Sequence, residues 1–206
     1  MKKAWERVRL SVENLLGAVA AEVVVCTKCS LSRTRSNAVP GAGNPEAKII
    51  FVGEAPGQSE DVKGEPFVGV AGKFLDELLS EIGLSRKNVF ITNVVKCRPP
   101  RNRPPDPGEI AVCRPYLDRQ VEIIKPCFIV TLGNHSTAYV FSKTGLVFGG
   151  ITQAHGKSHR ITLHGMQVIV FPTFHPASAL YNPKYKEMLH ADFRLLKNEM
   201  CKQPLL

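Results

Sequence analysis

Hydrophobic residues gather in four short runs that are separated by longer segments of mixed polarity. The runs are rich in β-branched residues and are nearly continuous rather than alternating, which is typical of strands buried on both faces of a parallel sheet. They cover residues 48–53, 88–95, 127–133 and 166–174. We expect each run to form one strand of a single central sheet.

Helical periodicity falls between these runs. Residues 73–82 carry apolar side chains at helical spacing, which predicts a helix. The predicted helix ends before Gly83, a residue that favours the end of a helix. Residues 106–125 begin with Asp-Pro-Gly-Glu, which resembles a capping box, and Pro115 is expected to kink or split this helix. Further helices are expected within residues 1–25, over 134–142 and over 183–197.

Strands that alternate with helices imply βαβ units with right-handed crossovers. The pattern therefore predicts the α/β class: one three-layer α/β/α sandwich domain over residues 1–206, with a central four-stranded parallel sheet. Ligands in such folds bind outside the carboxyl ends of the strands. The residues that follow the four runs are Glu54 to Gly57, Asn93 with Lys96 and Cys97, Gly133 to His135, and His175 to Ala177.

Composition narrows the class of partner. The chain has 206 residues, 44% hydrophobic and 22% charged, which are ordinary values for a globular protein. Its 27 Lys and Arg against 18 Asp and Glu give a net charge of +9, which indicates a polyanionic partner, nucleic acid before acidic lipid. No apolar run is long enough to cross a membrane. The basic first segment is interrupted by Glu6 and Glu13, so we expect an amphipathic helix, no signal peptide and a cytoplasmic protein.

Cysteine spacing indicates a metal centre in a reducing compartment. The six cysteines stand at positions 26, 29, 97, 113, 127 and 201. The first two form a C-x-x-C pair, and Cys97 and Cys113 are each followed by Arg-Pro, so four thiolates are available for a zinc ion or an iron–sulfur cluster. The alternative is that Cys97 and Cys113 are small core residues. We expect Cys127 in the core and Cys201 outside the ligand set.

Three features near the strand ends are candidates for binding a ligand. The Gly53–Gly57 turn presents backbone N–H groups to a ligand, or is a structural turn only. Phe67 lies in a glycine-rich loop, where it either stacks on a base or staples the following helix. His175 shares the carboxyl edge of the sheet with Glu54 and Asn93, which favours a functional role over a structural one.

Six segments together resemble the family 4 uracil-DNA glycosylases, the thermostable iron–sulfur type. They are CTKC (26–29), GEAPGQSED (53–61), GEPFVGVAGK (64–73), NVFITNVVKCRPP (88–100), CRP (113–115) and FHPASAL (174–180). The similarity extends from Cys26 to Lys197, in family order. It implies the α/β/α fold with four parallel strands. It also implies a [4Fe-4S] cluster whose ligands are Cys26, Cys29, Cys97 and Cys113.

The resemblance implies a DNA repair enzyme that hydrolyses the N-glycosidic bond of uracil in single- and double-stranded DNA. Free uracil is released and an abasic site remains for base excision repair. The resemblance implies that Phe67 stacks on the flipped uracil and that Asn93 hydrogen-bonds the edge of the base. It also implies that His175 donates a hydrogen bond to O2 of the uracil as negative charge develops there. Leu180 fills the gap left in the duplex. The backbone that lines the base and sugar comes from Gly53, Glu54, Ala55, Pro56 and Gly57.

One position departs from the better-known uracil glycosylases, which carry a water-orienting Asp where this chain has Ala55. Glu54 and Glu60 are the candidate replacements. We favour Glu54 for the water and expect Glu60 to shape the pocket against the 5-methyl group of thymine. A related branch traps the sugar with a His between the two CRP motifs, but no His lies between Cys97 and Cys113, so we expect plain turnover by a monomer.

Two other functional classes compete with the enzyme. The first is a non-catalytic iron–sulfur module for nucleic-acid binding or redox work, and the second is a zinc-bound structural domain. The proline-rich segment 98–108 is expected to direct basic side chains toward phosphates, whereas the basic residues of the last helix are expected to form a solvated face. The basic residues of the proline-rich segment are Arg98, Arg101 and Arg103.

Overall fold

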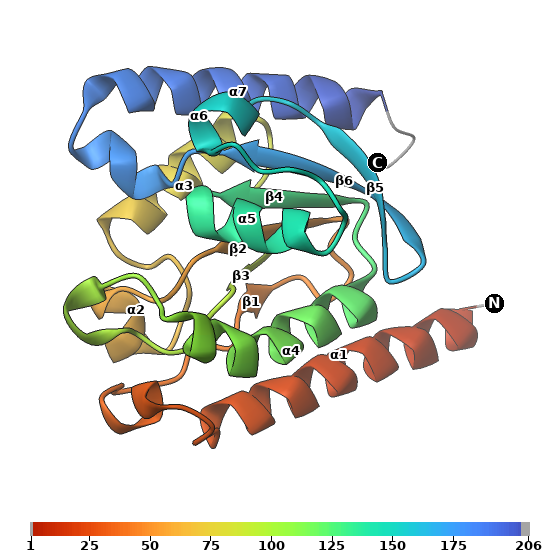
Figure 1. Ribbon diagram of the computed structural model, residues 1–206. Helices are drawn as coiled ribbons and strands as arrows, with labels where there is room; N and C mark the ends of the chain where they lie inside the picture. Colours follow the sequence, from red (N-terminus) through yellow and green to blue (C-terminus); the bar gives the residue numbers. More distant parts are fainter. Residues whose placement is uncertain (1, 203–206) are drawn as a thin grey trace.

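A six-stranded mixed sheet forms the centre of the molecule (Figure 1). The computed structural model describes residues 2–202, with side chains from residue 12 onward. The strand order is β1-β3-β2-β4-β6-β5; the four middle strands run parallel and the two edge strands are antiparallel. The strands are β1 (Ala42–Gly43), β2 (Ile49–Gly53), β3 (Phe90–Asn93), β4 (Phe128–Leu132), β5 (His159–Leu163) and β6 (Met166–Thr173).

The predicted α/β/α class is confirmed. The sheet has six strands instead of the four predicted, because the two edge strands were not predicted. The four apolar runs became β2, β3, β4 and β6, the parallel strands. Strand β5 was missed because its exposed and buried residues alternate, as expected for an edge strand with one covered face. Strand β1 has two residues, too few for any periodic signal. A two-residue turn at His164 and Gly165, both with positive φ, joins β5 to β6.

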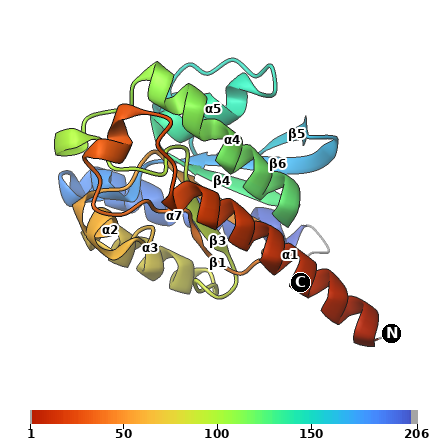
Figure 2. The same ribbon diagram turned by 90° about the horizontal axis from the view of Figure 1, so that it is seen from below.

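Helices cover both faces of the sheet (Figures 1 and 2). Helices α1, α4 and α5 pack on one face, and α3 and α7 pack on the other. The helices are α1 (Lys2–Val24), α2 (Gln58–Lys63), α3 (Val70–Glu81), α4 (Pro107–Ile124), α5 (Asn134–Ser142), α6 (Ile151–Ala154) and α7 (Pro183–Cys201). No helix within residues 2–202 has the length and apolar character that a membrane span requires.

Each middle strand contributes to two cores, which explains its continuous hydrophobic pattern. In β2, Ile50 and Val52 face the core beneath α1 and α4, whereas Ile49 and Phe51 face the core beneath α3 and α7. Since neither face is exposed to water, polar residues are excluded from both sets of positions.

Helix α4 begins as its sequence predicts. Asp106 is the N-cap residue of a capping box, and Glu109 Oε2 accepts a hydrogen bond from the Asp106 backbone N–H at 2.8 Å. Of the two outcomes expected at Pro115, a kink or a split, the split does not occur, because α4 continues from Pro107 to Ile124. Pro115 lies on the exposed side of α4, while Cys113 and Leu117, two residues away on either side, are buried, and this packing supports the helix where one backbone hydrogen bond is lost.

Candidate active site

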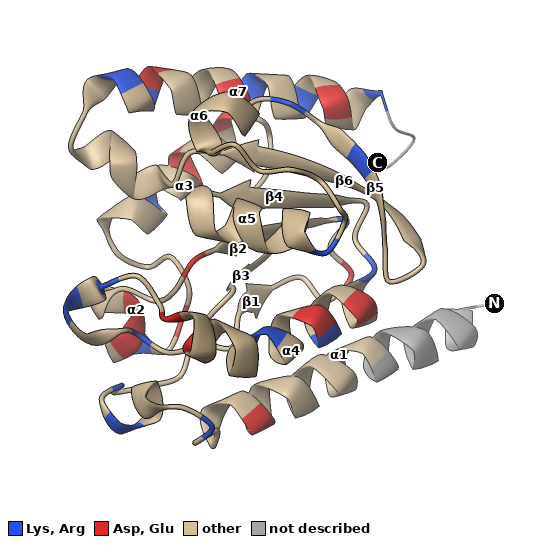
Figure 3. Cartoon of the chain, in the orientation of Figure 1, with Lys and Arg blue, Asp and Glu red and all other residues tan. Residues whose placement is uncertain are grey.

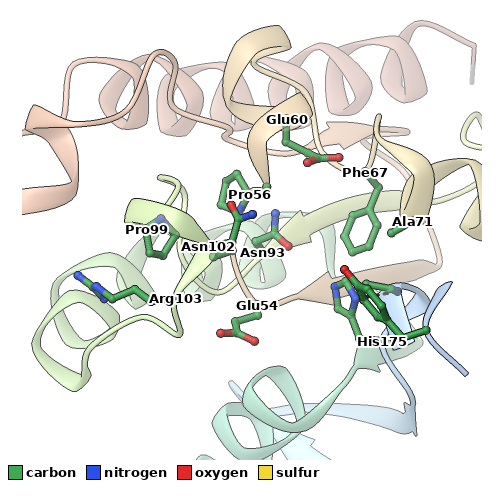
Figure 4. Close-up of a pocket in the computed structure, with 14 residues that line it drawn as sticks. Glu54, Pro56, Glu60, Phe67, Ala71, Asn93, Pro99, Asn102, Arg103 and His175 are labelled. Atoms are coloured by element: carbon green, nitrogen blue, oxygen red, sulfur yellow. Dashed lines mark hydrogen bonds between the residues drawn. The ribbon is translucent and has the colours of Figure 1, made fainter. Parts of the chain in front are cut away.

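A cavity of about 330 Å³ opens at the carboxyl edge of the parallel strands (Figure 4). We call it the edge cavity. It brings together eight of the ten residues predicted for base binding and catalysis, namely Glu54, Ala55, Pro56, Gly57, Glu60, Phe67, Asn93 and His175. The other lining residues are Ala71, Pro99, Asn102, Arg103, Ala177 and Tyr181; of these we had predicted a role only for Arg103, toward phosphates.

The two remaining predicted residues lie next to the edge cavity. Gly53 is the last residue of β2, and a Cβ there would stand 2.3 Å from Asn93 Oδ1 and 2.8 Å from the Phe67 ring. Only glycine therefore allows these two side chains to approach the strand end. Leu180 is 46% exposed at the end of a 3₁₀ turn (Pro176–Leu180), beside the exposed cavity residue Tyr181.

The position of the edge cavity follows from the topology. The chain leaves β2 toward β3 on one side, and leaves β4 toward β6 on the other, although β2 and β4 are neighbours. Loops that diverge in this way leave a crevice at the carboxyl ends of the two strands. Glu54 directly follows β2, Asn93 ends β3 and His175 comes two residues after β6, so residues far apart in the sequence converge there.

Phe67 is held in a strained backbone conformation. Its φ is 53°, a left-handed value that is uncommon for a bulky residue, and its side chain is buried. Arg86 donates hydrogen bonds to the carbonyl oxygens of both Pro66 and Phe67, which fixes the turn. The Phe67 ring stacks on the His175 ring, with centroids 5.5 Å apart and planes inclined by 29°. The aromatic face is thus fixed at the cavity wall before any ligand arrives.

Asn93 carries an unpaired polar atom. Its side chain is 1% exposed, and its Oδ1 accepts no hydrogen bond from any described residue. Leaving a buried amide oxygen unpaired costs about 1–3 kcal/mol. A ligand that brings an N–H donor to this oxygen recovers that cost, so Asn93 is prepared to recognise a donor.

His175 is a neutral hydrogen-bond donor. Burial lowers its pKa to about 4, against the opposing influence of the Glu60 carboxylate, so the ring is uncharged at neutral pH. Its Nδ1 accepts a hydrogen bond from the Ala177 backbone N–H at 3.1 Å. In a neutral imidazole the proton must then reside on Nε2, which makes Nε2–H the donor that is free for a ligand.

The two carboxylates of the edge cavity are engaged differently. Glu60 Oε1 accepts hydrogen bonds from the backbone N–H groups of Val68 at 2.9 Å and Gly69 at 2.8 Å, so it secures the loop that carries Phe67. Glu54 Oε2 lies 2.8 Å from His135 Nδ1, and its side chain is 29% exposed. Figure 4 draws Glu54 and Glu60 on opposite sides of the cavity. We predicted no role for His135, whose one sequence signal was its place after β4.

The rim of the cavity is the segment between β3 and α4, where Figure 3 shows a concentration of basic residues. Arg101 and Asn102 both have a φ of 56°, and Asn102 Oδ1 accepts a hydrogen bond from Arg98 Nε at 2.7 Å. Arg103 binds the buried Glu109 through both terminal nitrogens, at 2.7 and 2.9 Å. Arg103, which we expected to face phosphates, is thus already paired with a carboxylate, while its side chain stays 37% exposed.

Four cysteines come together at a second, smaller cavity. Cys26, Cys29, Cys97 and Cys113 all line it, between the end of α1, the start of α4 and the segment after β3. We call these four residues the cysteine site. Arg35 Nη1 donates to Cys97 Sγ at 2.9 Å, and the backbone N–H of residue 96 donates to Cys113 Sγ at 3.2 Å. Cys127 and Cys201 line neither cavity.

The cysteine site offers four ligands to a metal centre. Burial raises the pKa of the Cys113 thiol to about 11 and also raises the pKa of Cys97. Four thiolates are the ligand set of a tetrahedral zinc ion or of an iron–sulfur cluster, and four cysteines that line one small cavity fit either group.

Comparison with known proteins identifies relatives over most of the chain. A sequence model of the uracil DNA glycosylase superfamily matches residues 40–197. The type-4 uracil-DNA glycosylase of Saccharolobus solfataricus is 52% identical over 191 residues, 92% of this chain and 88% of the relative. The type-4 uracil-DNA glycosylase of Sulfurisphaera tokodaii is 56% identical over 183 residues, which are 88% of this chain and 83% of the relative. The type-4 uracil-DNA glycosylase of Thermotoga maritima is 48% identical over 170 residues, which are 82% of this chain and 85% of the relative.

Proposed function

The chain belongs to the uracil DNA glycosylase superfamily and is a type-4 uracil-DNA glycosylase, and we propose on this basis how its residues act on DNA. The enzyme hydrolyses the N-glycosidic bond of uracil in DNA, releasing free uracil and leaving an abasic site for base excision repair. The observation that supports the site assignment best is the unpaired Asn93 Oδ1, buried in the same cavity as Phe67 and His175.

Asn93 selects uracil over cytosine. Its Oδ1 accepts the N3–H of uracil, and its amide N–H donates to O4. Cytosine has an acceptor at N3 and a donor at C4, so both contacts would oppose like groups and leave Asn93 unpaired in a buried site. Phe67 supplies the stacking face for the base, and the fixed Glu60 carboxylate stands where a thymine methyl group would displace it from its hydrogen bonds.

Bond cleavage leaves negative charge on the departing base. As the bond between C1′ and N1 breaks, its electron pair moves to uracil and the sugar becomes oxocarbenium-like. The neutral His175 donates from Nε2–H to O2, where the charge develops, and one fixed donor of this kind contributes about 3–4 kcal/mol to the transition state. A water oxygen then bonds to C1′, its proton passes to Glu54, and the uracil anion takes a proton from solvent on release.

DNA reaches the cavity with the uracil turned out of the helix. Leu180 and Tyr181 form an exposed tip at the end of the 3₁₀ turn that His175 begins. This tip is suited to enter the space that the flipped nucleotide vacates. The exposed Arg101 on the rim provides a cation for the phosphate backbone.

Cys26, Cys29, Cys97 and Cys113 would hold the [4Fe-4S] cluster, consistent with the type-4 relatives. When bound, the cluster supplies iron–thiolate bonds that cross-link the end of α1, the loop after β3 and the start of α4. That loop is also tied to the edge cavity. Lys96 Nζ donates to the Asn93 carbonyl oxygen at 2.8 Å, and the Val95 N–H donates to the Glu54 carbonyl oxygen at 2.9 Å. We assign the cluster a scaffolding role for the backbone that carries these two residues.

A labelled oligonucleotide with a single uracil tests the proposed function. The purified, cluster-loaded protein should release uracil and leave an alkali-sensitive site in single- and double-stranded DNA. His175→Ala should slow release by about a hundredfold or more while DNA binding stays near that of the wild type. A protein that binds this DNA with strong salt dependence yet leaves it intact would instead be the non-catalytic nucleic-acid-binding module.

A further inference from the structure

Two loops meet at the crevice between β2 and β4. Glu54 directly follows β2, and His135 lies in the first turn of α5, directly after β4. The two strands are paired in parallel, with Val52 opposite Thr131 near their carboxyl ends. Side chains from the two loops therefore start close together, and Oε2 of Glu54 lies 2.8 Å from Nδ1 of His135.

The ion pair leaves one oxygen of the Glu54 carboxylate for a second partner. A carboxylate has only acceptors, so at a separation of 2.8 Å the proton between the two groups lies on His135 Nδ1. Oε2 faces His135, and Oε1 remains for another donor. Glu54 lines the edge cavity, so a donor bound there can reach its carboxylate.

The two residues before His135 are each held by a hydrogen bond. The Gly133 N–H donates to the Thr173 carbonyl oxygen at 2.8 Å, and Asn134 Oδ1 accepts from the Ile151 N–H at 2.9 Å. The same turn packs on His175, since a Cβ at Gly133 would stand 3.1 Å from the His175 Cβ. The His135 backbone is thus set relative to the catalytic strand ends before DNA binds, which is the preorganisation that a positioning group requires.

We infer that His135 is a positioning residue for water addition. Its Nδ1–H holds one oxygen of Glu54 so that the other faces C1′ of the flipped nucleotide and accepts the proton of the attacking water. His135 keeps its own proton throughout. The inference rests on the role of Glu54 proposed above, and it explains how a chain with Ala55 at the usual water-orienting position keeps a directed carboxylate.

Single-turnover uracil release, measured over a range of enzyme concentrations, tests the inference. His135→Ala should lower the maximal rate by about ten- to a hundredfold, part of the 10²–10⁴-fold that a general base typically contributes. The half-saturating enzyme concentration should not change. His135→Asn should recover most of the loss, because its amide donates from nearly the same place as Nδ1. A matched control is His190→Ala, which breaks a similar His–Glu pair, His190 with Glu81, outside both cavities and should leave the rate unchanged.

A double-mutant cycle separates this inference from its premise. Glu54→Gln should be slow, and adding His135→Ala to it should change the rate by no more than about twofold, because coupled residues are not additive. A Glu54→Gln enzyme with normal activity would overturn the proposed role of Glu54. A slow Glu54→Gln beside a fully active His135→Ala would overturn only the positioning role. A His135→Ala enzyme with a higher half-saturating concentration but the normal maximal rate would show that His135 contacts DNA instead.

Discussion

The edge cavity and the cysteine site share one segment of chain but are stabilised in opposite ways. In the cavity the functional side chains are held by protein groups: Glu60 secures the loop of Phe67, and Ala177 fixes the ring of His175. In the cysteine site the thiols are buried where their ionised forms are disfavoured, as the raised pKa values of Cys97 and Cys113 show. Metal coordination requires thiolates, so the cluster proposed for this site would stabilise the ionised forms that burial disfavours.

The comparison indicates that the residues of the edge cavity serve the chemistry, whereas the residues of the cysteine site serve the stability of the fold. In the proposed mechanism the ligand satisfies the unpaired Asn93 oxygen only while it is bound, whereas the proposed cluster would remain on its four cysteines. Substitutions in the cavity should therefore reduce the rate with the fold intact. Substitutions in the cysteine site should reduce stability first and activity as a consequence.

Cys113→Ser should give the largest effect. Loss of one ligand should remove the absorbance near 400 nm and lower Tm by about 10 °C or more, since metal binding free energy is folding free energy. Thermal unfolding followed by circular dichroism measures this. The matched control is Cys201→Ser, an exposed cysteine on α7 that should leave spectrum and Tm unchanged. A colourless Cys113→Ser protein with normal Tm would break the comparison.

Asn93→Ala should separate rate from stability most sharply. The rate of uracil release should fall by about 10²–10³-fold, the usual cost of one positioned polar group. The free energy of unfolding should change little, because the substitution also removes an unpaired buried oxygen. Denaturant unfolding and single-turnover kinetics on the same sample measure both quantities. A loss of stability in proportion to the loss of rate would contradict the assignment of Asn93 to ligand binding.

Phe67→Leu should have a smaller effect on the rate. Leucine keeps the position apolar and buried but removes the aromatic face, so the rate should fall by about ten- to a hundredfold, as for one stacking contact of 1–3 kcal/mol. The comparison is sharpened by Arg86→Lys, which keeps the ring and weakens the two hydrogen bonds that hold its turn. If Phe67 is only a helix staple, Phe67→Leu would lower Tm while the rate per folded molecule stayed normal.

His175→Gln should reveal the smallest effect, in the pH dependence of stability. The folded-state pKa of His175, about 4, lies below its ordinary value of 6.5, so the unfolded chain binds more protons between these values. Stability supported by the neutral ring is therefore present above pH 6.5 and declines as the pH falls toward 4. Between pH 7 and 5.5 the wild type should lose about 1 kcal/mol more than His175→Gln in urea unfolding. Equal losses would mean that the histidine is not held neutral by burial.

Much of the scaffold could be predicted because its signals are local. The run that became β2 is apolar on both faces, and the Asp106 capping box predicted the start of α4. The motif at Gly53–Gly57 and the cysteine spacing also predicted residues that converge in the two cavities. Strand β5 was missed because an edge strand alternates like a surface segment, and Pro115 does not split α4 because packing outweighs one lost hydrogen bond.

By itself the sequence determined the alternation of strands and helices, the residue types available at the strand ends, and the four clustered cysteines. Only the tertiary structure decided which of those groups meet: His135 with Glu54, Arg103 with Glu109, and Glu60 with the loop of Phe67. It also decided that His175 is neutral and that Asn93 lacks a partner. The physical reason is that local patterns follow from backbone geometry, whereas protonation and hydrogen-bond partners depend on burial and on contacts between distant segments.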